Sequence, residues 1–363
     1  MKFTKLAIES NPSAEPARLV RVDRANPCEV CGKPDWCSAA DNGAFAICMR
    51  VESDRAARNG GWVHRLEQGR TFEPRLVTVT QHYRAGIDAR DAVYSDFITA
   101  LELRDRDRIT LHNRGLDDTT IRRNGYRSMP RLGETNLVMA ALKDDDLSGI
   151  PGFYRRDGEW KLNLGASQDR YGQIRSFNQG LLIPIRDPEG RIEAFQIGRV
   201  DVRPGEPRYI WLSSSKQQDG AGSGAPIHFR NPGRIGERAI LTEGALKADV
   251  TARLLGNRCG VIAIAGVQSF RSNLGERLRS EFPALRSITI AFDADYDRKP
   301  EVRAAFDRLK DSLERAGLQT ERLVWPEARG KGIDDHLHNH PEWREKVLEM
   351  CGPDRIIQRE IER

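Results

Sequence analysis

The sequence predicts an α/β protein with a small cysteine-rich module, a mixed α+β middle region, and a C-terminal domain built on a mostly parallel sheet. Four of the six cysteines lie between Cys28 and Cys48. Strand patterns are frequent in residues 149–212, and from Arg238 onward apolar strands alternate with helical patterns, as in a parallel sheet covered by helices on both faces. We place the domains at 1–75, 76–235 and 236–340, with a helical tail at 341–363.

Length and composition limit the class of protein. A chain of 363 residues has room for two or three domains, and 39% hydrophobic with 31% charged residues indicates a folded protein. The net charge of +5 weakly favours a polyanionic partner. The sequence has no signal-peptide pattern and no run of eighteen apolar residues, so we expect a cytoplasmic protein with no membrane partner.

The clustered cysteines predict a structural zinc site. The ligands that we predict are Cys28, Cys31, Cys37 and Cys48. The first two have the spacing of a zinc knuckle. The Asn-Gly pair at 42–43 is typical of a two-residue hairpin turn, which would place Cys37 opposite Cys48. Cross-strand Cβ atoms lie about 4.5–5.5 Å apart, close enough for two thiolates to share a metal. A disulfide or ordinary buried residues remain alternatives, as does His64 in place of Cys37.

The middle region combines strand signals with basic residues. Residues 115–126 predict a short capped helix, and 187–190 predict the turn of a hairpin. Three basic residues, Arg199, Arg208 and Lys216, surround the aromatic Tyr209. Such a mixture suits single-stranded nucleic acid, through phosphate pairing and base stacking. A solvated charged face explains the same residues equally well.

The C-terminal third predicts strands and helices in strict alternation. The strands are expected at 238–244, 260–266, 287–295 and 320–325, and the helices at 245–256, 269–282 and 299–317. Gly317 is a plausible end for the third helix. Residues 326–337 are expected to form a loop after the fourth strand.

Acidic residues follow three of these strands. They are Glu243, Asp293, Asp295, Asp334 and Asp335. Side chains two apart on an extended segment share a face, and ligands gather outside the carboxyl ends of parallel strands. Close carboxylates raise a pKa or need a counter-cation, and their oxygens suit Mg²⁺ or Mn²⁺. We therefore predict a metal site at this edge with Lys331 beside it, although each acid alone could be a solvated loop residue.

These motifs resemble a known family. The order of glutamate-glycine, aspartate-x-aspartate and a lysine-containing loop with paired aspartates is similar to the TOPRIM domain of bacterial DNA primases. Upstream, "GLLIPIRDPEGRIEAFQIGRVDVRPGEPRYIWLSS" resembles the basic subdomain of DnaG-type primases, and the cysteine module matches the position of their zinc ribbon. The "PDWC" and "GGWVHRL" segments resemble primase-like proteins of phages, plasmids and other mobile elements. The resemblance covers roughly residues 25–65 and 110–340.

The resemblance implies a fold and site residues. The fold would be a zinc ribbon, a basic α+β subdomain and a TOPRIM domain. Glu243, Asp293 and Asp295 would be catalytic, with Glu243 as metal ligand or general base, and Asp334 and Asp335 would complete the Mg²⁺ or Mn²⁺ site. Nucleotide or DNA binding is expected of Arg199, Arg208, Tyr209, Lys216, Lys247 and Lys331. Two residues depart from the family pattern: Lys247 replaces a further aspartate, and Val51 replaces the last cysteine.

The implied activity is DNA priming. Nucleoside triphosphates would be joined on a single-stranded DNA template by two-metal nucleotidyl transfer. Because the chain has no GxxxxGK[ST] motif, a separate replicative helicase is a candidate partner. The alternatives are a TOPRIM nuclease that uses the same acids and a catalytically silent zinc-containing protein that binds single-stranded DNA. The tail at 341–363 either docks a partner or forms the last helix of the fold.

Overall fold

The computed structural model divides into two compact units, Met1–Gln81 and His82–Arg363. It describes residues 19–40, 43–55, 57, 61–66, 83–168, 174–176, 178–200, 202–203, 206–266, 269–298 and 300–351. Among these residues, no helix combines the length and apolar character needed to cross a bilayer.

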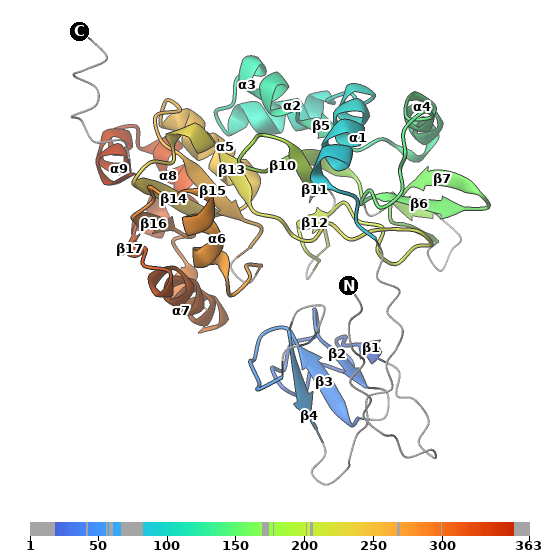
Figure 1. Ribbon diagram of the computed structural model, residues 1–363, viewed down its shortest axis with the longest axis horizontal. Helices are drawn as coiled ribbons and strands as arrows, with labels where there is room; N and C mark the ends of the chain where they lie inside the picture. Colours follow the sequence, from blue (N-terminus) through green and yellow to red (C-terminus); the bar gives the residue numbers. More distant parts are fainter. Residues whose placement is uncertain are drawn as a thin grey trace. The chain divides into compact units, whose positions relative to one another are not determined.

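The first unit contains one antiparallel sheet, drawn in blue in Figure 1. Its strands, in spatial order, are β1 (Leu19–Arg21), β2 (Ser38–Ala40), β3 (Phe45–Cys48) and β4 (Trp62–Arg65). Ser38 pairs with Ile47 and Ala39 with Ala46, which confirms the register predicted for the β2–β3 hairpin. Residues 41–42 of its expected turn lie outside the described residues. This register brings Cys37, one residue before β2, next to Cys48 at the end of β3.

The second unit begins with the middle region, whose four-stranded sheet has the order β12-β11-β10-β5 (Figure 1). Its helices are α1 (Ile87–Thr99), α2 (Asp105–Asn113), α3 (Asp118–Asn124), η1 (Leu132–Glu134) and α4 (Thr135–Ala141). Its strands are β5 (Arg127–Ser128), β6 (Phe153–Arg156), β7 (Glu159–Leu162), β8 (Ala166–Gln168), β9 (Ile174–Ser176), β10 (Gly180–Arg186), β11 (Ile192–Arg199) and β12 (Tyr209–Trp211).

Two local predictions for this region are confirmed. The side chain of Asp117 caps α3 by accepting a 2.7 Å hydrogen bond from the Thr120 N–H, and Gly125 ends the helix at φ 79°. Strands β10 and β11 pair antiparallel around residues 187–190, as the turn signal predicted.

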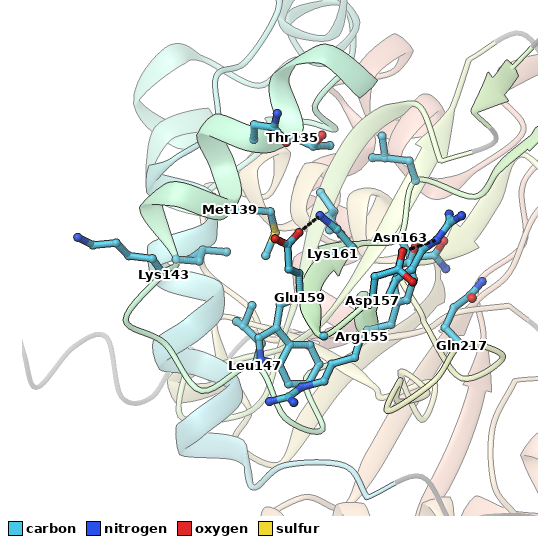
Figure 2. A pocket seen from close by; sticks show the side chains of 18 of the residues that line it. Thr135, Met139, Lys143, Leu147, Arg155, Asp157, Glu159, Lys161, Asn163 and Gln217 are labelled. Atoms are coloured by element: carbon cyan, nitrogen blue, oxygen red, sulfur yellow. Dashed lines mark hydrogen bonds and ion pairs between the residues drawn. The ribbon is translucent and has the colours of Figure 1, made fainter.

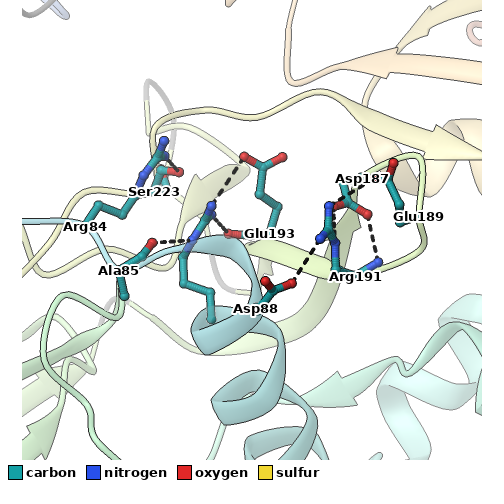
Figure 3. Close-up of polar contacts among 9 residues, drawn as sticks. Arg84, Ala85, Asp88, Asp187, Glu189, Arg191, Glu193 and Ser223 are labelled. Atoms are coloured by element: carbon teal, nitrogen blue, oxygen red, sulfur yellow. Dashed lines mark hydrogen bonds and ion pairs between the residues drawn. The ribbon is translucent and has the colours of Figure 1, made fainter. Parts of the chain in front are cut away.

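Polar contacts hold α1 against the β10–β11 hairpin, as Figure 3 shows. The guanidinium of Arg191 lies 2.8 Å from an Asp187 carboxylate oxygen and 3.0 Å from one of Asp88 at the start of α1. Arg90 of α1 donates a hydrogen bond to the carbonyl of Glu193. Farther along the helix, the buried ring of Tyr94 packs against the hairpin's hydrophobic core. The hairpin is therefore fixed from both its polar and its apolar side.

The C-terminal region is a five-stranded sheet in the order β13-β15-β14-β16-β17, with helices on both faces (Figure 1). Its strands are β13 (His228–Arg230), β14 (Arg238–Glu243), β15 (Val261–Ile264), β16 (Ser287–Ala291) and β17 (Gln319–Arg322). The four predicted strands are confirmed and run parallel, and β13 joins β15 as an antiparallel edge strand that the sequence did not predict.

The helices divide between the two faces of this sheet. They are α5 (Ala245–Leu254), α6 (Leu274–Glu281), η3 (Tyr296–Arg298), α7 (Pro300–Arg315), α8 (Ile333–Asn339) and α9 (Trp343–Cys351), and the short turns η2 (Pro232–Arg234) and η4 (Glu327–Arg329) lie in connections. One hydrophobic cluster joins α6 and α7 to the strands, and another joins α5, α8 and α9. Because Val347, Leu348 and Cys351 are buried in the second cluster, the described part of the tail is the last helix of the fold.

Two C-terminal predictions differ from the structure. The second helix begins at Leu274, five residues later than predicted. The segment 326–337, predicted as a loop, contains the first turns of α8, with Asp334 and Asp335 in the first one. Carboxylates are favourable at a helix N-terminus because the exposed N–H groups carry partial positive charge. The acids that looked like loop ligands therefore begin a helix.

A buried polar network joins the middle region to the C-terminal sheet. Asp249 of α5 accepts a hydrogen bond from the hydroxyl of Tyr126 and lies 3.3 Å from His228 Nε2. The Arg186 backbone N–H donates to His228 Nδ1 at 3.1 Å, so the other ring nitrogen carries the proton and donates to Asp249. Arg230 Nε lies 3.6 Å from the same carboxylate. Asp249 thus accepts from the middle region through Tyr126 and from β13 through His228.

Replacing Asp249 by alanine should destabilise the protein by about 3 kcal/mol, because the change leaves buried partners without their acceptor. Urea unfolding followed by circular dichroism measures the loss. The control is Lys310→Ala, which breaks the half-exposed pair with Glu314 on α7 and should cost less than about 1 kcal/mol. Equal effects of the two variants would contradict a central role for Asp249.

The contribution of Asp249 should also depend on pH. Burial opposes its charge, but His228, Arg230 and the Tyr126 hydroxyl outweigh burial and lower the pKa of Asp249. A carboxyl with a lowered folded-state pKa stabilises the protein above its unfolded value, about 3.9, and loses that contribution as the pH falls further. The stability difference between wild type and Asp249→Ala should therefore shrink below about pH 4.

Candidate functional site

Four cysteines of the first unit form a closed metal site. The Sγ atoms of Cys28, Cys31, Cys37 and Cys48 all lie within 4.8 Å of one another. The Cys31–Cys37 and Cys37–Cys48 separations are 3.7 Å and 4.0 Å. A tetrahedral zinc with Zn–S bonds of about 2.3 Å places its sulfurs about 3.8 Å apart. The separations are too long for a disulfide and fit a structural zinc ion.

The chain around the cluster also suits thiolates. Backbone N–H groups donate to two of the sulfurs: Met49 N lies 3.4 Å from Cys37 Sγ, and Val51 N lies 3.3 Å from Cys48 Sγ. Burial raises the pKa of Cys37 and of Cys48, so a divalent cation is needed to keep both deprotonated. His64 Nε2 lies 2.9 Å from the carbonyl oxygen of Val51, and the group of four sulfurs is complete without it.

The second unit has a cavity of about 350 Å³ at the carboxyl ends of β14 and β16, where the C-terminal sheet meets the middle region. Eight predicted site residues line it: Glu243, Asp293, Asp334, Asp335, Lys247, Lys331, Arg208 and Tyr209. Arg114 and Gln196 of the middle region also line it. The cavity therefore combines acids from two strand ends and from the start of α8 with cations from several elements.

Lys247 lies between two of the acids. Gly244, at φ 83°, turns the chain directly from β14 into α5, so Lys247 follows Glu243 by one helical turn. Its ammonium forms an ion pair with Asp293 and lies 3.6 Å from Glu243 Oε1. Burial raises the pKa of Glu243 to about 7. Burial also opposes the charge of Lys247, but the two carboxylates outweigh it and raise the pKa of Lys247.

Asp293 and Asp295 share a second cation. Lys331 Nζ lies 3.8 Å from Asp293 Oδ2 and 3.8 Å from Asp295 Oδ2. The carbonyl of Lys331 accepts a 2.9 Å hydrogen bond from the Ala294 N–H, which holds the two segments together. The Lys331 side chain is 58% exposed, so it can move away. A hard divalent cation could then take the place of the ammonium beside these two carboxylates.

Asp334 is the most deeply buried acid of the cavity, and burial raises its pKa. Arg114 Nη1 donates to its Oδ2 at 2.8 Å. Its Oδ1 has no hydrogen-bond partner among the described residues. Asp335 instead turns back to accept a 3.2 Å hydrogen bond from the Gly332 N–H. Asp334 thus has a buried oxygen at the site that no described residue satisfies.

The acids do not all converge on one point. Within the described part of the chain, the cysteine cluster is the only group of three or more metal-ligating side chains with its ligand atoms close together. The structure brings Asp293 and Asp295 to a common cation, whereas Lys247 lies against Glu243. Asp293 therefore contacts both cations, Lys247 together with Glu243 and Lys331 together with Asp295.

Two predicted binding residues lie elsewhere. The Arg199 side chain is only 5% exposed, pairs with Glu206 at 2.8 Å and donates to the Pro207 carbonyl at 3.0 Å. Lys216 is exposed in the connection after β12. In the structure, Arg199 braces the β11–β12 connection through Glu206 and Pro207, while Arg208 and Tyr209 reach the cavity.

A larger hollow of about 1230 Å³ lies between α4 and the β6–β7 hairpin (Figure 2). Two of its cations already have partners within it. Lys161 pairs with Glu159 at 2.5 Å, and the Arg155 guanidinium stacks over the ring of Trp160 at 5.0 Å. None of the predicted site residues is among those that line it. The acidic cavity is therefore the stronger candidate for chemistry.

Comparison with known proteins identifies the fold. The zinc-binding and RNA polymerase domains of the Aquifex aeolicus primase are 20% identical with a TM-score of 0.50, and the match covers 73% of this chain and 61% of that one. The RNA polymerase domain of Mycobacterium tuberculosis primase DnaG, in complex with a double-stranded DNA oligomer with a 6-nucleotide overhang, is 18% identical with a TM-score of 0.50, covering 74% and 81%.

The structural neighbours are thus DnaG-type primase domains, and at these identities the likeness establishes the fold. This chain spans less than two thirds of the Aquifex chain. At the sequence level, residues 237–343 match the model of a domain of unknown function, DUF3854. No curated protein matches the sequence.

Arg114 is a charged residue of the cavity that the sequence did not predict. It belongs to a basic stretch without a recognisable motif and meets Asp334 across 220 residues of sequence. Its one distinctive local feature is its position just before the turn into α3, and that position does not indicate a chemical role. The contact could be found only from the fold.

Proposed function

We propose that this chain is a DNA primase, a nucleotidyltransferase that makes short oligonucleotides on a single-stranded DNA template. One observation carries the proposal: the acids Glu243, Asp293 and Asp334 meet the cations Lys247, Lys331 and Arg208 in one cavity of a primase-like fold. In this proposal the C-terminal sheet is a TOPRIM domain and the middle region is its basic partner.

The reaction is attack of a primer 3′-hydroxyl on the α-phosphate of a nucleoside triphosphate. A new P–O bond forms, the bond between the α- and β-phosphates breaks, and pyrophosphate leaves. A Mg²⁺ or Mn²⁺ ion held by Asp293 and Asp295 would lower the pKa of the attacking hydroxyl and neutralise the leaving group. Glu243, with a pKa of about 7, suits the proton acceptor for that hydroxyl.

The remaining residues would bind and orient the nucleotide and the template. Lys331 and Arg208 present positive charge to the triphosphate from two sides of the cavity. Tyr209, 38% exposed, offers a ring on which a base can stack. The zinc module would contact the template outside the cavity, and its four-ligand site serves structure rather than catalysis.

The direct test supplies purified protein with mixed-sequence single-stranded DNA, labelled ribo- or deoxynucleotides, and Mg²⁺ or Mn²⁺. We expect short labelled oligonucleotides that require the template. Cutting of the DNA without synthesis would instead support the nuclease, which needs the same acids. Binding without either reaction would support the catalytically silent DNA-binding protein.

Co-purification tests the proposed helicase partner. The protein is captured from cells that contain the replicative helicase of the same host or element, after nuclease treatment to remove bridging DNA. Recovery of the helicase at a constant ratio supports a direct complex. Its absence under these conditions would remove the helicase from the proposal.

Gly332→Ala should reduce oligonucleotide synthesis at least about tenfold with little change in melting temperature. An added Cβ would lie 2.4 Å from Asp334 Oδ1 and 2.9 Å from Lys247 Cε, so a site residue must move. The matched control is Gly236→Ala, whose added Cβ meets nothing within 4 Å. Rates from labelled nucleotides and melting curves compare the two, and equal rates would contradict the packing of Gly332 against the site.

A further inference from the structure

The positively charged side chain of Lys247 lies in the cavity, among the acids. The Lys247 ammonium forms an ion pair with Asp293 and lies 3.6 Å from Glu243 Oε1. Its side chain is only 16% exposed. A positive charge shared by two carboxylates at the carboxyl edge of a sheet occupies the place that a metal ion would take.

The position of Lys247 is built into the fold. The left-handed turn at Gly244 places it on the first turn of α5, above Glu243. The aliphatic part of its side chain runs over Gly332, where an added Cβ would lie 2.9 Å from Lys247 Cε. Helix α8, which follows Gly332, packs against α5. Because Gly332 has no Cβ, the Lys247 side chain can pass over it to reach the acids.

Lys247 and Lys331 differ in how easily each can move away from the carboxylates that it pairs with. Lys331, 58% exposed, contacts Asp293 and Asp295 at 3.8 Å and can turn to solvent when another cation arrives. If Lys247 left, the Glu243 and Asp293 carboxylates would remain close together and would lose the cation that lies against both of them. An incoming ion therefore replaces Lys331 and meets Lys247 still in place.

We propose that Lys247 is a built-in cation of the nucleotidyl-transfer site, so that the site takes one divalent ion, at Asp293 and Asp295, instead of two. This inference rests on the proposed function. The ammonium carries the positive charge that a second ion would supply beside Glu243, and its repulsion excludes a divalent ion from that position.

The test counts Mn²⁺ bound to the full chain, with the free ion measured by electron paramagnetic resonance. The protein is loaded with zinc first, because thiolates retain zinc against Mn²⁺. Wild type should bind one Mn²⁺ per chain in addition to its zinc. Asp293→Asn with Asp295→Asn should bind none. Lys247→Asp, which replaces the built-in charge by a ligand, should bind a second Mn²⁺.

Two further variants separate charge from misfolding. Lys247→Met keeps the aliphatic length but removes the charge, so it should also gain a second Mn²⁺. Lys331→Met should keep a single ion bound about tenfold more tightly, because only the mobile competitor is lost. Circular dichroism melting identifies any variant that fails to fold.

Two ions on wild type, no ion on wild type, or a single ion on folded Lys247→Asp and Lys247→Met would each overturn the proposal. Oligonucleotide synthesis is measured on the same samples. One ion without synthesis refutes the proposed primase activity alone, whereas two ions with synthesis refutes the role of Lys247 alone.

Discussion

Asp293→Asn combined with Asp295→Asn should lower the rate of oligonucleotide synthesis at least about 10³-fold. Asparagine keeps the shape of each side chain but removes both charges that share a cation in the cavity. The change leaves the buried strand β16 intact, so the fold should be retained. The rate is measured with labelled nucleotides on a single-stranded template, and folding by circular dichroism.

The matched control for this pair is Asp311→Asn. Asp311 is an exposed acid on α7, a helix that packs against the same sheet. The variant should keep the wild-type rate, because it removes a negative charge without touching the cavity. A double variant that retains more than about a tenth of the wild-type rate would show that the two aspartates are not central to the chemistry.

Cys48→Ser should remove the zinc ion and unfold the first unit. Structural zinc binding contributes about 10–16 kcal/mol in small zinc modules, far more than the small core around these cysteines can replace. Metal analysis should show one zinc per chain in wild type and none in the variant. Limited proteolysis should then cleave within residues 19–66, while residues 83–351 stay resistant.

His64→Asn is the control that separates the two ligand sets. His64 contacts the Val51 carbonyl, so this variant should keep its zinc and its resistance to protease. Loss of zinc from His64→Asn together with retention in Cys37→Ser would favour the histidine as fourth ligand. Zinc bound stoichiometrically to Cys48→Ser would contradict the four-cysteine site.

Local sequence patterns predicted much of the framework. The Asn-Gly pair predicted a hairpin register in which Ser38 pairs with Ile47, and the structure has that register. Asp117 caps α3, as expected of the short capped helix predicted for residues 115–126. These features are predictable because a turn, a cap or a period of two depends on neighbouring residues and on backbone geometry.

The same patterns failed where local signals conflict with packing. The segment 326–337 is rich in glycine and charge, which is typical of a loop, yet α8 begins at Ile333 because Ile333 and Leu337 are buried in the core beneath it. Strand β13 is only three residues long. Its pairing with β15 depends on an edge that exists only once the sheet has formed.

The sequence by itself predicted the cluster of four cysteines, the alternation of strands and helices, and the strand ends at which Glu243 and Asp293 lie. Tertiary structure alone decided how those acids are compensated: Arg114 reaches Asp334 across 220 residues, and Lys247 lies between Glu243 and Asp293. The reason is physical. A strand end depends on local geometry, whereas a charge is paired by whichever buried group the fold brings within a few ångströms of it.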